Sequence, residues 1–382
     1  MLTLLVFILI MSILVLVHEF GHFFAAKKMG VHVEEFGLGI PPTAIKKKIG
    51  DTVYSLNWLP FGGFVRLAGE DLEDTAEIKA ARHDSSNFMS KTALQRAIIL
   101  SAGVFMNVVL ALALYYVFFF FTGFKTLNLP LIFDYNFRFG NVTSINTVVT
   151  SMEKGSAADL AGIEPGEAIL EINNKPVYSI ADVRREVADK AGQKVSLLLM
   201  DEKQNTKHNL RTVSATPQKS SQGKGILGVF LSKSIVIDYS QGWNKLLAGP
   251  MQAYNMLAYS KFVFGKLIGL SVESKSAAPV SEGVAGPVGI YTVIGGILNY
   301  GGTQAFLGMV DFVALMSLSL AFLNIMPFPA LDGGRLLFVV IEMITGKKMN
   351  VHIESQIHKW GMILLLGLIV LITLKDVGNL FG

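Results

Sequence analysis

Three residues near the N-terminus have the types and spacing of a hydrolytic metal site. His18 and His22 lie four residues apart, and Glu19 follows the first of them, in the run His-Glu-Phe-Gly-His. On a helix, residues four apart share a face, so both imidazoles can bind one metal ion while Glu19 projects about 100° away. Zinc at such a site lowers the pKa of a bound water to about 7, and a nearby carboxylate can take the proton. The spacing therefore predicts a zinc site with Glu19 as general base.

This motif lies at the end of a long apolar run. Residues 2–17 are apolar except for Thr3 and Ser12. Ionisable side chains in or beside such a run are costly in a membrane, which favours a function for them. The alternative is a helix end whose polar residues only cap it or extend toward water. We favour the metal site, which then needs a third protein ligand from elsewhere in the chain.

Asp332 is the predicted third ligand. It lies in the run Leu-Asp-Gly-Gly, shortly after Pro327 and Pro329 interrupt an apolar run. Proline breaks a helix, and glycine lets the backbone turn close to a neighbour. The carboxylate can therefore complete a site of two histidines and one carboxylate, with water in the fourth position. Alone, this run would be an ordinary helix terminator; together with the first motif it predicts a metal centre.

The composition is that of a membrane protein. Hydrophobic residues make up 51% of the 382 residues and charged residues 16%, whereas soluble domains carry about 25% charged residues. A membrane-spanning helix needs roughly 20 apolar residues. Four such runs lie at about residues 2–26, 97–121, 306–323 and 361–374. The first run lacks a basic start and a cleavage site of small residues, so we interpret it as a retained span and not a signal peptide.

Charged residues predict the orientation and exclude some partners. Lysine and arginine are frequent between the first and second spans and between the third and fourth, which indicates that these loops are cytoplasmic. Both termini and the long middle region would then lie outside. The net charge is +4, and the basic residues flank the spans, which favours the lipid bilayer as a partner and no nucleic acid. The lack of cysteine excludes disulfides and thiolate chemistry.

Residues 53–67 are rich in β-branched and aromatic side chains, interrupted by Pro60, Gly62 and Gly63. This pattern predicts a hairpin with a glycine turn. Because the segment is apolar, we expect it to enter the membrane interface beside protein; an ordinary cytoplasmic hairpin is the alternative. In the second span, Asn107 is expected to hydrogen-bond a neighbouring helix.

Residues 128–238 mix polar residues with short β-like runs and have the length of one small domain. The segment 155–177 is similar to the pattern of bacterial PDZ domains. Ile226, Leu227 and Gly228 resemble the carboxylate-binding loop of such a domain, displaced to its end as in circularly permuted forms. PDZ domains bind extended peptides at a sheet edge. Here these residues would form the peptide groove, or the groove would be vestigial and the domain a size filter.

The whole chain resembles the site-2 proteases, which are intramembrane zinc metalloproteases, and in particular their RseP-like bacterial branch. The resemblance is carried by residues 18–22, by the run Asn-x-x-Pro-x-Pro-x-Leu-Asp-Gly-Gly at 324–334, by residues 61–64, and by residues 103–107. Two departures are visible. The chain has one PDZ-like region where well-known members have two, and Val104 stands where the family usually has proline.

The resemblance implies roles for individual residues. One catalytic Zn²⁺ would be bound by His18, His22 and Asp332, with Glu19 as the base. Asn324 would contact the substrate backbone. The β-region would clamp the substrate as an extended strand, through Phe61, Gly62, Gly63 and Phe64.

The implied fold is a multi-pass α-helical membrane protein with a four-span site-2 protease core, a membrane-associated β-region and an inserted circularly permuted PDZ domain (α+β). The expected parts are the first span with His-Glu-x-x-His (1–26), a cytoplasmic loop with the β-region (27–95), the second span (96–124), an extracytoplasmic PDZ domain (128–238), amphipathic interfacial helices (239–275), a linker with the start of an apolar stretch (276–303), the third span with Leu-Asp-Gly-Gly (304–334), a cytoplasmic loop (335–357) and the fourth span (358–378).

The implied function is zinc-dependent cleavage of transmembrane segments of single-span proteins that another protease has already trimmed. Expected partners are the transmembrane helix of a substrate, such as an anti-sigma factor or a signal-peptide remnant, the lipid bilayer, and an upstream site-1 protease. The expected location is the bacterial plasma (inner) membrane, with the active site toward the cytoplasm. An inactive scaffold that captures peptides is one rival, although it would not need Glu19. A transporter is another, and it predicts inverted repeats that the sequence does not show.

Overall fold

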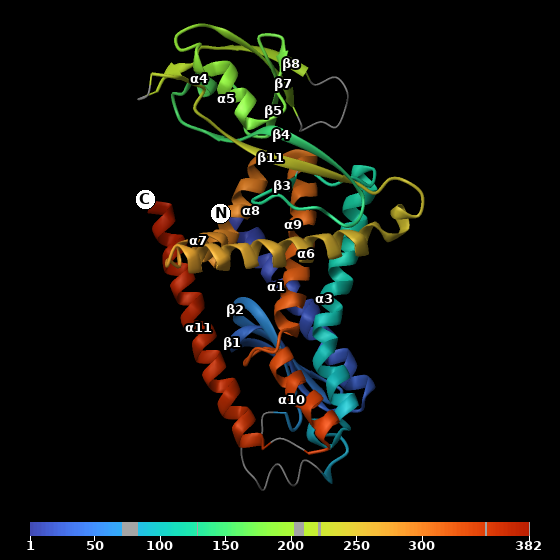
Figure 1. Ribbon diagram of the computed structural model, residues 1–382. Coiled ribbons are helices and arrows are strands. Elements are labelled where there is room, and N and C mark those ends of the chain that lie inside the picture. The colour runs from blue at the N-terminus through green and yellow to red at the C-terminus, as the bar shows by residue number, and fades with distance from the viewer. Residues whose placement is uncertain (71–82, 128, 202–209, 221–222, 348–349, 382) are drawn as a thin grey trace. The chain divides into compact units, whose positions relative to one another are not determined.

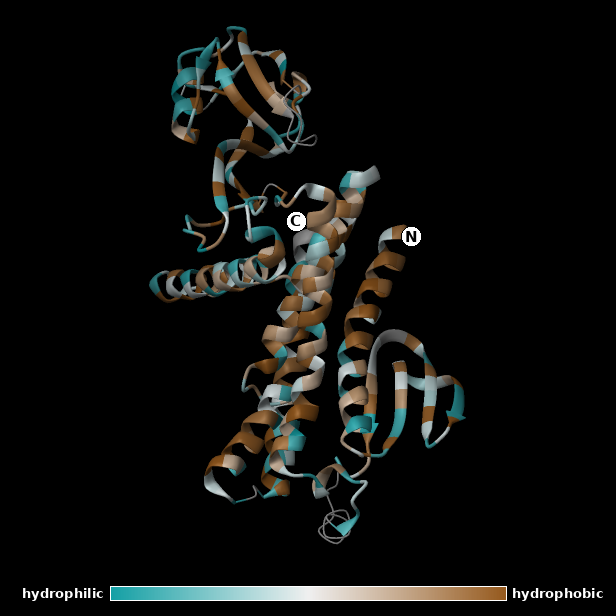
Figure 2. Cartoon of the chain, turned by 90° about the vertical axis from the view of Figure 1, so that its right-hand side faces the viewer, coloured by the Kyte–Doolittle hydropathy of each residue, from teal (hydrophilic) through white to brown (hydrophobic). Residues whose placement is uncertain are grey.

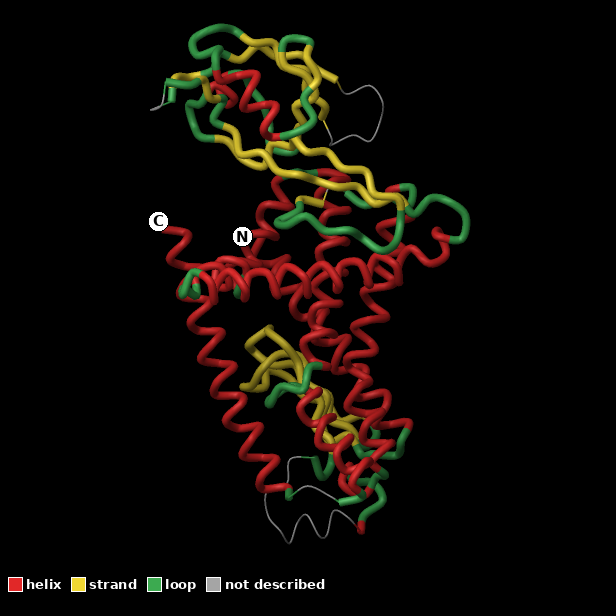
Figure 3. The backbone as a smooth tube through the Cα atoms, in the orientation of Figure 1, coloured by secondary structure: helices red, strands yellow, loops and turns green. Residues whose placement is uncertain are grey.

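The structure is a computed structural model that describes residues 1–70, 83–127, 129–201, 210–220, 223–347 and 350–381. The chain divides into two compact units, one formed by residues 1–118 and 252–382 and the other by residues 119–251. Figure 1 shows the elements of both units, and Figure 3 shows that strands are confined to one small region of the helical unit and to the second unit.

Four helices of the described chain are long and apolar enough to cross a membrane. They are α1 (Leu2–Lys28), α3 (Ala93–Thr122), α9 (Gly302–Ile325) and α11 (Val351–Phe381). Their outer surfaces are apolar, as the brown helices of Figure 2 show, and side chains such as Leu5 and Phe120 are exposed. Exposed apolar helix faces of this length require lipid around them. The prediction of a multi-pass helical membrane protein is therefore confirmed.

The β-region differs from the predicted hairpin. It consists of β1 (Val33–Ile49) and β2 (Thr52–Leu67), which are antiparallel. Both arms of β2 pair with β1: Gly37 lies opposite Ser55 on one side and opposite Phe64 on the other. The two arms of residues 53–67 are thus separated by β1 and are not partners of each other. Gly62, at φ 78°, lies in the bend between the arms, a backbone conformation that glycine adopts without strain.

Two ranges contain helices that were not predicted. Residues 276–303, expected as a linker with the start of an apolar stretch, form α7 (Ala278–Gly283) and α8 (Pro287–Asn299). Proline at the first turn suits a helix start, and the Asp376 carboxylate accepts the N–H groups of Gly286 and Gly289 at 2.8 and 2.9 Å. Residues 335–357, expected as a loop, are largely α10 (Asp332–Thr345) and the start of α11. Gly346, at φ 68°, ends α10 in the left-handed conformation common after helices.

One apolar core fixes the elements around the end of α1. It combines residues of α1, β1, β2, α3 and α10, among them Ala26, Val33, Leu67, Ile99 and Val339. A short 3-10 turn, η1 (Phe88–Ser90), adds Phe88 to this core. A second cluster packs Ile294 of α8 against Ile10 and Leu14 of α1. The helices that carry the predicted ligands are therefore held by packing on both sides of the motif.

The segment expected as one or two amphipathic helices is a single helix, α6 (Asn244–Glu273), with Pro250 inside it.

The second unit is a mixed α and β fold. Its main sheet has the strand order β3-β11-β4-β5-β7-β8, with β6 paired to β5, and a small sheet joins β9 and β10. The bounds of its elements are β3 (Leu129–Pro130), β4 (Asn141–Met152), α4 (Ala157–Leu160), β5 (Glu167–Ile172), β6 (Lys175–Pro176), α5 (Ile180–Ala188), β7 (Val195–Asp201), β8 (Leu210–Ala215), β9 (Gln218–Lys219), β10 (Gly225–Ile226) and β11 (Val229–Asp238).

The order of these elements fits the permuted PDZ arrangement that the sequence predicts. The strand that follows the predicted carboxylate-binding loop, β11, is the last strand of the unit and pairs with β4, which comes near its start. The core is formed by alternating residues of the strands and by Val183 and Val187 of α5. The predicted α+β insertion is thus present in the chain.

Candidate metal centre

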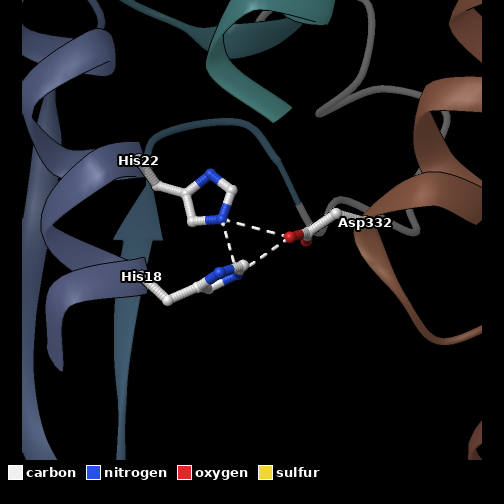
Figure 4. A group of neighbouring side chains, drawn as sticks. All are labelled: His18, His22 and Asp332. Carbon is white, nitrogen blue, oxygen red and sulfur yellow. Dashed lines mark hydrogen bonds and ion pairs between the residues drawn. The ribbon is translucent and has the colours of Figure 1, made fainter. Parts of the chain in front are cut away.

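The structure brings the three predicted ligands together (Figure 4). The Nε2 atoms of His18 and His22 lie 3.1 Å apart. Oδ2 of Asp332 lies 2.9 Å from Nε2 of His18 and 3.2 Å from Nε2 of His22. Ligand atoms bound to one zinc ion at about 2.0–2.1 Å must lie within about 4 Å of one another. These three atoms satisfy that condition, although their residues come from opposite ends of the chain.

The loop before α10 explains how Asp332 reaches the histidines. Asp332 is the first residue of α10, and the preceding loop returns onto this helix start. A Cβ atom at Gly333 would overlap the carbonyl groups of Ile325 and Met326, and one at Gly334 would come within 3.0 Å of the carbonyl carbon of Phe328. Ala330 has a φ of 77°, a conformation that costs an L-residue about 1–2 kcal/mol. The loop is therefore closely packed and strained at one residue, which the surroundings must hold in place.

The second imidazole nitrogen of His22 has a clear partner. Its Nδ1 lies 2.9 Å from the carbonyl oxygen of Ile99 in α3. A carbonyl can only accept, so Nδ1 carries the proton, which leaves the lone pair of a neutral Nε2 available to a metal ion. Metal-binding histidines usually have such an outer partner, which fixes the ring orientation.

Asn107 provides the corresponding partner for His18. The amide group of Asn107 lies 3.3 Å from Nδ1 of His18. Asn107 is fully buried, and its Oδ1 has no hydrogen-bond partner among the described residues. If Nε2 of His18 binds a metal, Nδ1 must carry the proton and needs an acceptor. The oxygen and nitrogen of an amide exchange places when it turns by 180°, which gives Nδ1 its acceptor and Oδ1 its donor. The donor set and this orphaned oxygen therefore fit a bound metal.

Gly103 makes room for both histidines. A Cβ atom there would lie 2.7 Å from Cε1 and 2.8 Å from Nε2 of His18, and it would overlap Nε2 of His22. Gly21 of α1 packs in the same way against the backbone of Ala102. The sequence marked residues 103–107 as part of the resemblance and predicted that Asn107 bonds a neighbouring helix, which its contact with His18 of α1 confirms; it did not place either residue at the metal centre. Their spacing of four on a membrane helix was the signal that they share the face turned to the metal centre.

Glu19 and Asn324 line the same small cavity as the ligands. The cavity has a volume of about 210 Å³, and its polar lining residues are His18, Glu19, Asn107, Asn324 and Asp332. The predicted base and the predicted substrate contact thus lie where a reacting peptide would have to enter. Apolar residues of α1 and α9, such as Leu14 and Leu320, complete the wall.

The predicted clamp residues are placed differently from one another. A Cβ atom at Gly63 would lie 3.6 Å from Cγ of Glu19, so β2 passes directly beside the predicted base. Gly62 lies in the bend of β2. Phe64 packs on Gly37 of β1 and is not part of the cavity lining. The side chain of Phe61 lies outside the described residues.

The predicted peptide loop of the second unit is only partly accessible. Leu227 is 3% exposed and belongs to the core, whereas Ile226 is 40% exposed. Gly228 has a φ of 70° and contacts Ser156. The carbonyl of Leu227 accepts the N–H of Ala158 at 3.0 Å, which ties the loop to α4. Among the described residues, β11 pairs with β3 only at Ser234 and Ile235, so residues 229–232 have one edge without a partner strand.

The donor triad and the four apolar helices define a membrane metalloprotease class, and comparisons with known proteins agree. The family sequence model of peptidase family M50 matches residues 6–368 of this chain. A candidate zinc metalloprotease of Clostridium perfringens is 32% identical over 97% of this chain and 97% of its own length. A candidate zinc metalloprotease of Synechocystis is 31% identical over 97% of this chain and 93% of its own. A chloroplastic membrane metalloprotease of Arabidopsis thaliana is 28% identical over 97% of this chain and 77% of its own.

The chain belongs to peptidase family M50, the site-2 proteases, and is a zinc metalloprotease. Among solved structures, the PDZ domain of an SdrC-like protein from Listeria monocytogenes matches 24% of this chain and 92% of its own, at 19% identity and a TM-score of 0.20.

Proposed function

We propose that this protein is an intramembrane endopeptidase that cleaves transmembrane segments of single-span proteins already shortened by another protease. The observation that carries the proposal is the cavity shared by His18, Glu19, Asn324 and Asp332, because most of its lining residues come from the membrane-spanning helices α1, α3 and α9. A peptide bond can reach Glu19 only if its chain enters the membrane region of the protein.

His18, His22 and Asp332 would hold one Zn²⁺, which when bound acidifies a water molecule and polarises a carbonyl group. Glu19 would accept the proton of the attacking water and return it to the leaving amine. Its position in the cavity beside the ligands supports this role. The Asn324 amide, in the last turn of α9, would hydrogen-bond the substrate backbone next to the cleaved bond.

The β-region would hold the substrate as an extended strand. A helix in lipid hides its amides, and unwinding it exposes backbone groups that lipid cannot satisfy. Pairing with the edge of a sheet satisfies them again. The arm of β2 at residues 63–67 pairs with β1 on one side, and Gly63 of this arm lies beside Glu19. A substrate strand added here would place its backbone at the base.

The orientation and the role of the second unit belong to the same proposal. The distribution of lysine and arginine supports cytoplasmic loops before α3 and after α9, with the second unit outside a bacterial plasma membrane. There it would admit only trimmed substrates, such as the remains of an anti-sigma factor or a signal peptide after a site-1 protease has acted. The partnerless edge of residues 229–232 supports peptide binding by strand addition as the means of selection.

The proposal is tested with a membrane-anchored reporter that carries a short outer stub, reconstituted with the full-length protein. Glu19→Gln should lower turnover by about 10²–10⁴-fold, the usual contribution of general acid–base catalysis. Glu34→Gln, at an exposed residue of β1, is the matched control and should leave turnover unchanged. Equal turnover of the Glu19→Gln variant and the wild type would contradict proteolysis and favour a peptide-binding scaffold.

A further inference from the structure

The loop that presents Asp332 is hydrogen-bonded to the fourth membrane helix. The backbone N–H of Ala330 donates to Nδ1 of His358 in α11 at 3.0 Å. Ala330 is the residue with the left-handed backbone, φ 77°, two positions before Asp332. Glycine would adopt this conformation freely, but alanine needs an outside contact to stay there. The hydrogen bond that Ala330 donates to His358 is such a contact.

The His358 ring is itself held in place. The ring of Phe338 in α10 meets it edge-on, with ring centres 5.7 Å apart and an interplanar angle of 80°. A Cβ atom at Gly334 would lie 3.2 Å from Cε1 of His358, so the first turn of α10 touches the same ring. One turn further along α11, a Cβ atom at Gly361 would come within 2.9 Å of the Pro329 carbonyl oxygen. Helix α11 therefore touches the loop at two successive turns.

The remainder of this interface is open. An apolar cavity of about 630 Å³ lies between the loop residues Phe328 and Pro329 and the α11 residues Ile357 and Trp360. Only 6% of the apolar window of α11 is buried, against 22–28% for the other three spans. Broad side-chain packing thus cannot fix the loop on α11, and the position of the loop relative to this helix depends on the few contacts made by His358 and Gly361.

We propose that His358 is a positioning residue of the metal centre. By accepting the Ala330 N–H, it holds the loop in the left-handed turn from which Asp332 reaches His18 and His22. Without an acceptor, this N–H would be left unsatisfied in a largely apolar setting, which is unfavourable. The loop would rotate to find another partner and would carry the Asp332 carboxylate with it. The inference rests on the metal site and not on the identity of the substrate.

The test is the zinc affinity of the full-length protein in detergent, measured by competition with a chromophoric chelator. His358→Asn keeps an acceptor close to the position of Nδ1, whereas the amide of His358→Gln reaches the position of Nε2. We expect His358→Asn to bind zinc within about 3-fold of the wild type. His358→Gln and His358→Leu should bind about 10–100-fold more weakly, as for the loss of other outer partners of metal ligands. His352→Gln, at an exposed histidine of the same helix, is the control and should bind normally.

The comparison of His358→Asn with His358→Gln decides the matter, because both variants keep a polar side chain of similar size. Equal zinc affinities for these two variants, whether high or low, would overturn the inference. A wild-type protein that binds zinc but cleaves no membrane-anchored reporter would contradict the proposed function alone.

Discussion

The metal centre and the peptide loop of the second unit are built on opposite principles. At the metal centre, side chains would do the binding; Gly103 makes room for the two imidazoles, and Gly21 and Gly333 let backbone segments pack closely around them. At the loop of residues 226–228, the backbone would do the binding, and the Leu227 side chain serves the core. A side-chain site is visible in a sequence through its residue types. A backbone site can be recognised in a sequence only by resemblance to a known domain, because its residue types carry no chemistry of their own.

Among the substitutions that test this difference, the largest loss of zinc affinity is expected from Gly103→Ala. The added methyl group would lie within 3 Å of the His18 ring and overlap His22, so neither imidazole could keep its place. Zinc affinity should fall by more than about 100-fold, beyond the usual loss for an outer partner. Gly367→Ala, at a helical glycine with open space around it, is the control. Normal zinc affinity of Gly103→Ala in the chelator competition would show that the helices are not packed as described.

A smaller effect is expected at Asn107. Asn107→Leu removes the acceptor for Nδ1 of His18 and should weaken zinc binding by about 10–100-fold. Asn107→Asp keeps an acceptor at the same place and should bind zinc much more tightly than the leucine variant. Ser101→Ala, on the same helix, tests for general damage to α3, since its hydroxyl only bonds its own helix backbone. Similar losses in both Asn107 variants would rule out the acceptor role.

Substitutions in the predicted peptide loop should lower the stability of the second unit and leave zinc binding unchanged. Leu227→Ala should destabilise that unit by about 2–5 kcal/mol, as for other buried leucines. Ile226→Ala, next to it but exposed, should change stability by less than about 0.5 kcal/mol. Hydrogen exchange of the strands β4 to β7 in the full-length protein measures both. Zinc affinity should be unchanged in the two variants; a loss in either would show that the loop and the metal centre are energetically coupled.

The smallest effect concerns the start of α5. The Ser179 hydroxyl caps this helix by accepting the Asp182 N–H and also donates to the Asp182 carboxylate. Ser179→Ala should cost about 1 kcal/mol of stability in the second unit. The Ser179 hydroxyl and the Tyr178 N–H lower the pKa of Asp182. A lowered pKa in the folded state stabilises the fold above the ordinary carboxyl pKa, and this is lost as the pH falls through the lowered value. The difference between variant and wild type, followed by hydrogen exchange, should therefore shrink in acid.

The sequence alone was sufficient to predict features that depend on residues close together in the chain. The spacing of His18 and His22 depends on one helix, and the four spans depend on runs of apolar residues, so both could be predicted. Asp332 required two distant segments to be combined, and it could be named because prolines and glycines mark an opened helix end beside it. The structure adds that the ligand atoms of these three residues lie within 4.8 Å of one another.

The sequence was insufficient where partners are distant and the pattern is ambiguous. Residues 53–67 look like a hairpin by themselves. In the structure, residues 33–40, which come earlier in the chain, lie between the two arms and pair with both. Gly289, Gly295 and Gly296 weakened the sequence signal for a helix at α8. The helix is stabilised by packing of Ile294 against Ile10 and Leu14 of α1. His358 gave no signal at all, since its contact is with the backbone of Ala330, 28 positions away.

X-ray absorption at the zinc edge, on the full-length protein and on a His18→Phe variant, tests the central claim most directly. The account predicts one zinc ion per chain with two imidazole nitrogens and carboxylate or water oxygens at about 2.0–2.2 Å. In the variant, this signature should be lost. A zinc ion that keeps two imidazole ligands in the variant would show that the metal is bound elsewhere and would contradict the account.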